Sequence, residues 1–215
     1  MIGRRGVLAG GAALTVAANQ QAAAADQPDL RFEVMRNGSR IGHHAIRFRR
    51  EGAGLEATIE VDIVVRFGPI VLYRYLMQVR EVWRDGAFVS LESETNDDGT
   101  RHRVKAMRVP DQVIVDVSGA PRAVFPPNTI PLTHWNNQCM SRPLFNPQDG
   151  VAISSSVIAR GEASIALADG REVRATRFSL IDDVVLDDWY DTSNHWTALR
   201  APGRDGSTID YRRSV

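Results

Sequence analysis

The pair of residues with the clearest chemical potential is His134 and the only cysteine of the chain, Cys139. A cysteine becomes a nucleophile when a base takes its proton, so this pair suggests a thiol enzyme, with Asn136 as a further polar group. In a helix, a spacing of five residues turns the two side chains about 140° apart, too far to hydrogen-bond on one face. We therefore expect Cys139 to need a base from elsewhere, and we favour the simpler interpretation of a small buried side chain. The other histidines are His43, His44, His102 and His195.

The sequence contains no motif for a metal ion, a nucleotide or another cofactor. His43 and His44 are adjacent, so in a strand they point to opposite faces and cannot share a metal. The acidic group between Asp182 and Asp191 lacks the glycine and terminal glutamate of an EF-hand loop, and a solvated strand edge explains it better. Phosphate-binding glycine loops and G-x-S-x-G turns are also missing. We predict no cofactor and no metal, and we lean against an enzyme.

Aromatic and arginine side chains on the expected strands predict a different kind of site. Tyr73 and Tyr75 share one face of a strand, while Arg74 faces the other way. If the sheet is curved, its concave face would form a lipophilic pocket, with arginines at the rim to meet an anionic headgroup. Ordinary core packing of the same aromatic residues is the alternative. The residues that we assign to this ligand site are Arg66, Tyr73, Arg74, Tyr75, Trp135, Asn136, Trp189 and Tyr190.

The elements that must position these residues are predicted to be antiparallel strands. Residues 57–63 alternate apolar and polar side chains, and Asn37-Gly38 is typical of a tight hairpin turn. Strand patterns follow one another with short connections, and none resembles a βαβ unit. We therefore predict a mainly β, single-domain fold, a curved antiparallel meander that forms a half-barrel or open barrel. The one expected exception is a short helix over 133–141 with Thr133 as its N-cap.

Residues 1–25 differ from the rest of the chain and predict an export signal. Arg4 and Arg5 precede an apolar stretch rich in glycine and alanine, and Ala23-Ala24-Ala25 stand before Asp26, where a signal peptidase would cut. The paired arginines are typical of twin-arginine leaders, while a general-secretion signal and an uncleaved anchor stay open. We expect one β domain over 26–215 in the periplasm or secreted, with no stable transmembrane span after cleavage. The charge is balanced, 26 basic against 26 acidic residues, which argues against a nucleic-acid partner.

Several short motifs follow one another along residues 30–213. They are Asn37-Gly38, Ile41-Gly42, Val71 to Tyr75, Glu81-Val82-Trp83, Thr95 to Gly99, His134-Trp135-Asn136, Leu144 to Gly150 and Asp188-Trp189-Tyr190. As a set they resemble a family of bacterial secreted proteins known only as a domain of unknown function. The resemblance implies no activity and no catalytic residue, and Cys139 is not part of its pattern. The meander is more distantly similar to the half-barrel of lipoprotein-localisation factors, which hold acyl chains in a concave cavity.

Three functions stay open on the sequence. The first, which we favour, is non-enzymatic binding of a lipid or other amphiphile, or of a protein partner at the cell envelope. The second is an envelope enzyme that uses His134, Asn136 or Cys139. The third is a structural interaction module without a small ligand. Reactivity of the Cys139 thiol separates the second from the others, because an inert thiol removes the nucleophile.

Overall fold

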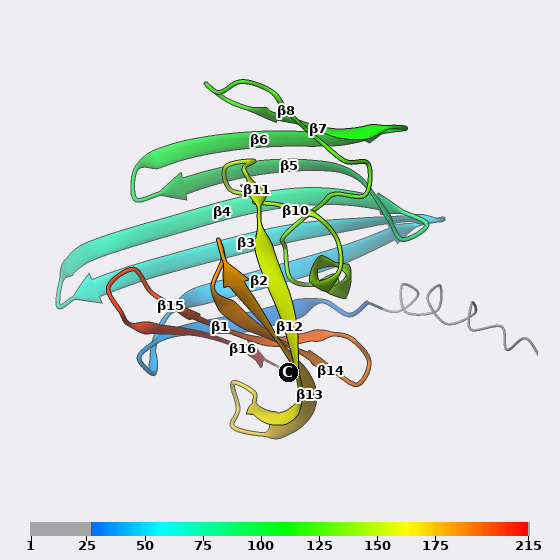
Figure 1. Cartoon of the computed structure of the whole chain (residues 1–215). Helices are drawn as coiled ribbons and strands as arrows, with labels where there is room; N and C mark the ends of the chain where they lie inside the picture. The colour runs from blue at the N-terminus through cyan, green and yellow to red at the C-terminus, as the bar shows by residue number, and fades with distance from the viewer. Residues whose placement is uncertain (1–26, 215) are drawn as a thin grey trace, which may run out of the picture.

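Most of the chain that the structure describes is β-strand. The computed structural model describes residues 27–214, so the predicted signal in residues 1–25 lies outside the described part. No helix within residues 27–214 is long and apolar enough to cross a membrane. The strands of the large sheet, shown in Figure 1, are β1 (Leu30–Arg36), β2 (Ser39–Glu51), β3 (Gly54–Phe67), β4 (Ile70–Arg84), β5 (Ala87–Asp97), β6 (Thr100–Val109), β7 (Gln112–Val117), β8 (Ala123–Phe125), β12 (Ser155–Ala166), β13 (Glu172–Asp182), β14 (Leu186–Asp191), β15 (Trp196–Pro202) and β16 (Thr208–Ser214).

These strands form one 13-stranded antiparallel sheet in the order β12-β13-β14-β15-β16-β1-β2-β3-β4-β5-β6-β7-β8. The first strand pairs with the last, so both halves of the chain meander outward from the β1–β16 pair. The two edge strands, β12 and β8, do not pair with each other, so the sheet is not closed. Figure 1 shows that the sheet is curved. This confirms the prediction of a mainly β, single-domain fold with an open, barrel-like antiparallel meander.

Local sequence explains why the central strands form and which face they bury. In β3 and β4, the inward residues Ile59, Val61 and Ile63 pair with Val79, Met77 and Tyr75 across the ladder. The residues between them stay more exposed, as expected for a sheet with one buried face. Gly42 of β2 is required where the strands approach closely, because a Cβ there would lie 2.0 Å from the backbone oxygen of Asp62.

The long connection from β8 to β12 packs against the concave face of the sheet. It carries a small three-stranded sheet and a 3-10 helix, and its side chains Trp135 and Phe145 are buried in the same core as Trp83 and Phe88. Trp135 packs edge-on against Trp83, with ring centroids 5.5 Å apart. The connection thus fills one end of the curved sheet. Its elements are β9 (Ile130–Pro131), η2 (Asn137–Met140), β10 (Leu144–Phe145) and β11 (Ala152–Ile153).

The helix predicted over 133–141 is wrong in its extent and in its cap. The structure has only the four-residue 3-10 helix η2, and its N-cap is Asn136, whose side chain accepts a hydrogen bond from the Gln138 amide. The reason lies at His134, whose φ of 65° is in the left-handed region. A residue in that conformation interrupts a right-handed helix, so no helix can begin at Thr133.

Candidate functional site

The structure leaves a cavity of about 350 Å³ between the concave face of the sheet and the β8–β12 connection. One wall is formed by inward residues of β3 and β4, and the opposite wall by the connection and by strands β14 to β16. No lysine, arginine, aspartate or glutamate is among the lining residues. They are His44, Ile59, Val61, Ile63, Tyr73, Tyr75, Met77, Val79, Leu132, Thr133, His134, Asn146, Pro147, Gln148, Ile153, Val184, Leu186, Leu199 and Tyr211.

A polar cluster at the hairpin side of the cavity holds the two lining tyrosines in place. The Tyr73 hydroxyl donates to Asp97 Oδ1 at 2.7 Å, and the Tyr75 hydroxyl donates to Gln148 Oε1 at 3.1 Å. Gln148 in turn donates to Asp97 Oδ2 at 3.3 Å, and the exposed guanidinium of Arg204 lies 3.6 Å from the same oxygen. Burial raises the pKa of both tyrosines, so their hydroxyls stay protonated. The cluster ties β4, β5 and the β15–β16 turn together beside the cavity.

A histidine and a buried aspartate form the main polar pair of the opposite wall. His134 Nδ1 lies 2.8 Å from Asp188 Oδ2, and the other oxygen of Asp188 accepts from Trp196 Nε1 at 2.9 Å. The imidazole also stacks on the Trp196 ring, with centroids 5.1 Å apart. In the neutral form of His134, donation from Nδ1 to Asp188 makes Nε2 the hydrogen-bond acceptor. The pair can therefore orient a proton acceptor at the cavity wall.

A second histidine of the lining, His44, is uncharged for a different reason. It is 6% exposed and packs against Phe32, Trp196 and Tyr211. Burial lowers its pKa to about 3, and the neighbouring His134 adds to this effect. Its Nε2 has no hydrogen-bond partner among the described residues. This aromatic wall therefore contributes apolar surface without a charge at neutral pH.

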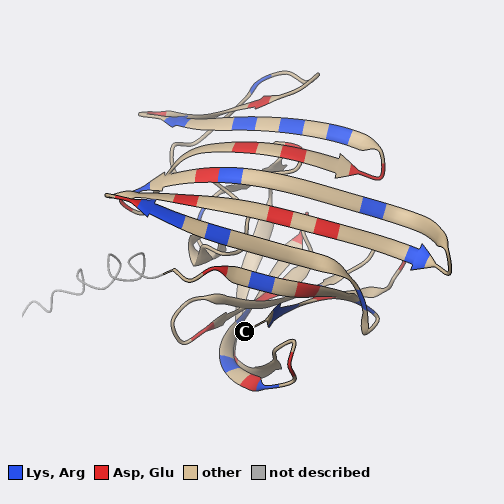
Figure 2. Ribbon diagram, turned by 180° about the vertical axis from the view of Figure 1, so that it is seen from behind, with Lys and Arg blue, Asp and Glu red and all other residues tan. Residues whose placement is uncertain are grey.

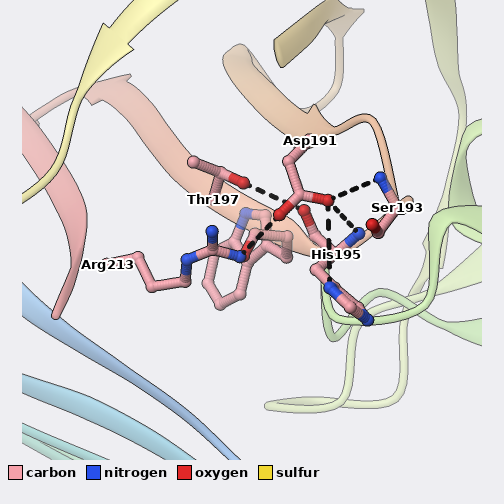
Figure 3. A network of polar contacts seen from close by, with 6 residues as sticks. Asp191, Ser193, His195, Thr197 and Arg213 are labelled. Atoms are coloured by element: carbon pink, nitrogen blue, oxygen red, sulfur yellow. Dashed lines mark hydrogen bonds and ion pairs between the residues drawn. The ribbon is translucent and has the colours of Figure 1, made fainter. Parts of the chain in front are cut away.

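A separate polar network holds the turn between β14 and β15, which leads into Trp196 at the start of β15 (Figure 3). Asp191 Oδ1 accepts hydrogen bonds from the backbone amides of Ser193 and His195, and Asp191 Oδ2 accepts from Arg213 Nη1 at 3.0 Å. Thr197 donates to the His195 carbonyl at 3.0 Å. These contacts join β14, β15 and β16 at one point. Asp188 lies on β14 and Trp196 lies on β15, and both contact His134. The network therefore holds in place the two strands whose side chains position His134.

Cys139 lies deep in the core and away from the cavity lining. Its Sγ is 3.4 Å from the Tyr190 hydroxyl, and that hydroxyl donates to the backbone oxygen of His134 at 2.7 Å. Burial raises the pKa of the thiol, and the Asp188 carboxylate adds to the effect. Cys139 is therefore held as a neutral thiol beside Tyr190, and within residues 27–214 no imidazole forms a hydrogen bond with its sulfur.

We expect Cys139 to be inert in the folded protein. At pH 8, native Cys139 should react with a thiol reagent on the order of 100-fold more slowly than in denaturant, because reaction requires local opening of the core. The measurement is the rate of absorbance change with a disulfide reagent. A Met107→Cys variant supplies an exposed reference thiol in the same chain. Rapid labelling of native Cys139 at a rate close to that of the reference would show that the thiol is accessible and ionised.

The structure places the sequence-predicted ligand residues in three different environments. Tyr73 and Tyr75 line the cavity, as does His134. Trp135 and Tyr190 belong to the buried core, and Asn136 caps η2. The remaining three residues belong neither to the cavity lining nor to the main core. They are Trp189, which packs with Ala175 and Ala198 under the Arg177 guanidinium, and Arg66 and Arg74, which are exposed.

Sequence reasoning missed Glu81, a fully buried carboxyl group in the core next to the cavity-lining strand segment. Its Oε2 accepts hydrogen bonds from two indoles, Trp83 Nε1 at 2.9 Å and Trp135 Nε1 at 3.0 Å. Burial raises its pKa to about 7, and these hydrogen bonds limit the shift. A signal was present, because the alternation of β4 that turns Met77 and Val79 inward does the same for Glu81. Within residues 27–214, no group of three or more His, Cys, Asp or Glu residues could hold a metal ion.

Comparisons with known proteins agree on the fold and assign no activity. A family model described as "Domain of unknown function (DUF6134)" matches residues 32–214. The chain is also similar to a solved structure from Brucella abortus, described as a beta-barrel-like protein of domain of unknown function DUF1849. The TM-score is 0.61 at 8% identity, over 86% of this chain and 94% of that chain. This likeness concerns the fold alone. No curated protein matches the chain.

Proposed function

Since the chain belongs to the DUF6134 family, a domain of unknown function, we propose its role from the cavity: non-enzymatic binding of a small, uncharged amphiphilic molecule. The single observation that carries this proposal is a cavity of about 350 Å³ that is lined without any lysine, arginine, aspartate or glutamate. Volumes from about 300 Å³ upward are typical of ligand pockets, whose walls are mostly apolar with a few placed polar groups. A purely structural module has no need of such a cavity.

The charges behind the lining favour an uncharged ligand over an anionic one. The polar lining groups Tyr73, Gln148 and His134 are each held by a carboxylate, either Asp97 or Asp188. An anionic headgroup at this wall would lose its hydration and face two carboxylates, with no lining cation to compensate. Hydroxyl, amide and imidazole groups can instead exchange neutral hydrogen bonds with a ligand. The proposal therefore replaces the anionic headgroup suggested by the arginines of the sequence with a neutral polar group.

Two fluorescent probes that differ by one charge test the proposal. We expect N-phenyl-1-naphthylamine, which is uncharged, to bind at least about 10-fold more tightly than 8-anilino-1-naphthalenesulfonate, because the sulfonate would be desolvated without a cation. The Ile63→Trp variant should reduce binding of the uncharged probe at least about 10-fold by filling the cavity. Both are measured by fluorescence titration.

A matched variant controls for changes to the strand itself. Val64 is the neighbour of Ile63 on β3 and is not a lining residue, so Val64→Trp should leave probe binding unchanged.

Native mass spectrometry of gently purified protein then identifies a co-purifying molecule. Equal binding of both probes, or unaltered binding by Ile63→Trp, would show that the probe does not occupy this cavity.

One observation favours a second function, an acid–base enzyme. His134 is held at the cavity wall by Asp188 at 2.8 Å, the arrangement of a general base and the group that orients it. In this alternative Asn136 has a structural role as the η2 cap, and Cys139 has none in the chemistry. Chemical conversion of a cavity ligand by the native protein, and its loss in His134→Gln, would replace the binding proposal with this one.

We also propose that the protein is exported to the periplasm, because residues 1–25 have the composition of an export signal. Arg4 and Arg5 followed by an apolar stretch and alanines support export by the twin-arginine route. Cell fractionation of the full chain beside an Arg4→Lys, Arg5→Lys variant tests the route. Retention of the variant in the cytoplasm supports twin-arginine export, whereas unchanged export favours general secretion.

A further inference from the structure

The β3–β4 hairpin extends beyond the strands on both sides of it. Toward the turn of this hairpin, the pairing of β2 with β3 ends at Gly42 and Ile63. The pairing of β4 with β5 ends at Tyr75 and Asp97. From Val64 to Tyr73, the two strands pair only with each other within the described sheet. At about 3.3 Å per residue, this leaves roughly 10–15 Å of hairpin that projects from the sheet. Figures 1 and 2 show the hairpin as the longest extension of the sheet.

The end of this hairpin is apolar and exposed. Phe67 is 74% exposed, Ile70 and Leu72 are each 58% exposed, and Val71 is 46% exposed. They surround the Gly68-Pro69 turn, and they include neighbours in sequence, so both faces of the hairpin end are apolar. The other large exposed apolar side chains of the described chain are Met107, Val124, Val151 and Val185, which come from separate elements. Contiguous apolar surface of this kind marks an interaction site.

The charged residues near the hairpin end indicate what kind of partner this apolar surface can bind. Between Val64 and Arg74, the charged residues are Arg66 and Arg74, and no acidic residue occurs. Arg66 forms no ion pair within residues 27–214, and the Arg74 guanidinium is 3.9 Å from Asp62 at its closest ion-pair contact. Figure 2 shows the hairpin end in tan with blue bands on its two strands, and the red segment next to its base is the β5–β6 turn, whose Asp98 contacts the Arg74 backbone. The apolar side chains lie at the tip of the hairpin and the arginines lie nearer its base. This order corresponds to that of a bilayer, in which the apolar acyl region lies beneath anionic headgroups.

We propose that the β3–β4 hairpin is a membrane-docking element that inserts Phe67, Ile70 and Leu72 into an anionic lipid bilayer surface. Arg66 and Arg74 then lie at the level of the lipid headgroups. Tyr73, at the base of the hairpin, lines the cavity, so docking brings the cavity to the bilayer surface. The inference goes beyond the proposed ligand binding and does not rest on it, because an empty cavity leaves the hairpin unchanged.

The test places a probe on the hairpin itself in the full chain. An Ile70→Cys variant is labelled under native conditions with an environment-sensitive nitrobenzoxadiazole fluorophore, since Cys139 is buried. With vesicles of phosphatidylglycerol and phosphatidylcholine, we expect a blue shift, an intensity increase of about twofold or more, and quenching by lipids that carry a quencher in the acyl region. Adding Phe67→Ser and Leu72→Ser to the labelled variant should raise the vesicle concentration for half-maximal response at least about 10-fold.

A matched label on another surface separates hairpin insertion from binding by any other segment. Met107→Cys carries the same fluorophore on exposed β6 and should show no acyl-region quenching. Several results would overturn the proposal. They are no response at position 70, an equal response at position 107, an equal response with phosphatidylcholine alone, or a lipid-independent response that rises with protein concentration and so indicates a second copy of the chain.

Discussion

Replacing Asp188 with alanine is expected to lower the free energy of unfolding by about 3 kcal/mol, because the change removes a buried acceptor shared by two rings. Asp188 is 0% exposed, and its oxygens contact His134 Nδ1 at 2.8 Å and Trp196 Nε1 at 2.9 Å. Trp196 keeps one bond, to the Ala198 carbonyl at 3.1 Å, whereas His134 loses its described side-chain partner. Urea unfolding at pH 7 measures the change, read as a lower midpoint at unchanged slope.

An Asp188→Asn variant is the control that separates shape from charge. The amide oxygen can still accept from Trp196, so we expect a loss of about 1 kcal/mol or less. Its NH2 group, however, faces His134 Nδ1 and favours the tautomer in which Nε2 carries the proton. The cavity wall then presents a donor in place of an acceptor, and binding of the uncharged arylamine probe should weaken. If Asp188→Ala were as stable as the native protein, the pair would have no structural role.

Replacing Glu81 with glutamine is expected to stabilise the protein at pH 8 by about 3 kcal/mol. The carboxyl pKa is 4.5 in its ordinary state and about 7 in the fold, and each pKa unit corresponds to about 1.4 kcal/mol. Between these two values the folded state holds the proton more tightly than the unfolded state. Raising the pH from 4.5 to 7 therefore lowers the free energy of unfolding, and above pH 7 the full loss of about 3 kcal/mol is present. Glutamine can still accept from both indoles without ionising.

The pH dependence is the decisive measurement for Glu81. We expect the Glu81→Gln gain to be near zero at pH 4 and to reach its full value by pH 8, where it raises the melting temperature by roughly 6–12 °C. His44 has the opposite effect: its pKa of about 3 in the fold makes the protein less stable as the pH falls below 6.5. His44 is present in both proteins, so its contribution cancels in the difference between them. A gain that does not change with pH would mean that Glu81 is not the ionising group.

The two buried carboxyl groups near the cavity, Glu81 and Asp188, reduce the free energy of unfolding relative to well-packed apolar side chains at the same positions. Glu81 lies beside the β4 wall, on the same inward face as Met77 and Val79, and Asp188 lies behind His134 on the opposite wall. A core built only for stability would carry apolar side chains at both positions, because burying a carboxylate requires compensating hydrogen bonds. Such a cost is typical of sites that position polar groups for a ligand. This reasoning supports the cavity as the functional site and makes its walls the first targets for mutation.

Local patterns in the sequence were sufficient for the strands and for part of the cavity. Alternation over residues 57–63 predicted the inward face of β3, and Asn37-Gly38 predicted the β1–β2 hairpin. The same alternation placed Tyr73 and Tyr75 on one face of β4, where both line the cavity. These predictions hold because side-chain direction in a strand depends only on neighbouring residues.

Alternation alone did not show which face of a strand lies inside the sheet. The sequence placed both Trp189 and Tyr190 of β14 in the predicted ligand site, although neighbouring residues of a strand point to opposite faces. In the structure Tyr190 belongs to the main core, whereas Trp189 packs in a separate small cluster. The helix at 133–141 failed for a related reason. Its composition suits a helix, but His134, which contacts Asp188 and Trp196 of the sheet, has a φ of 65°.

The strand pattern and the composition of residues 1–25 are properties of the sequence by itself. The first predicted the fold class, and the second is the basis for expecting export. Only the tertiary structure decided that the β8–β12 connection packs against the concave face of the curved sheet and leaves a cavity between itself and that face. It also decided that His134 meets Asp188 across 54 residues of chain and that Trp135 meets Glu81 across the same separation. Contacts between such distant segments depend on how the whole sheet curves and closes its loops, and no local spacing of residues records that geometry.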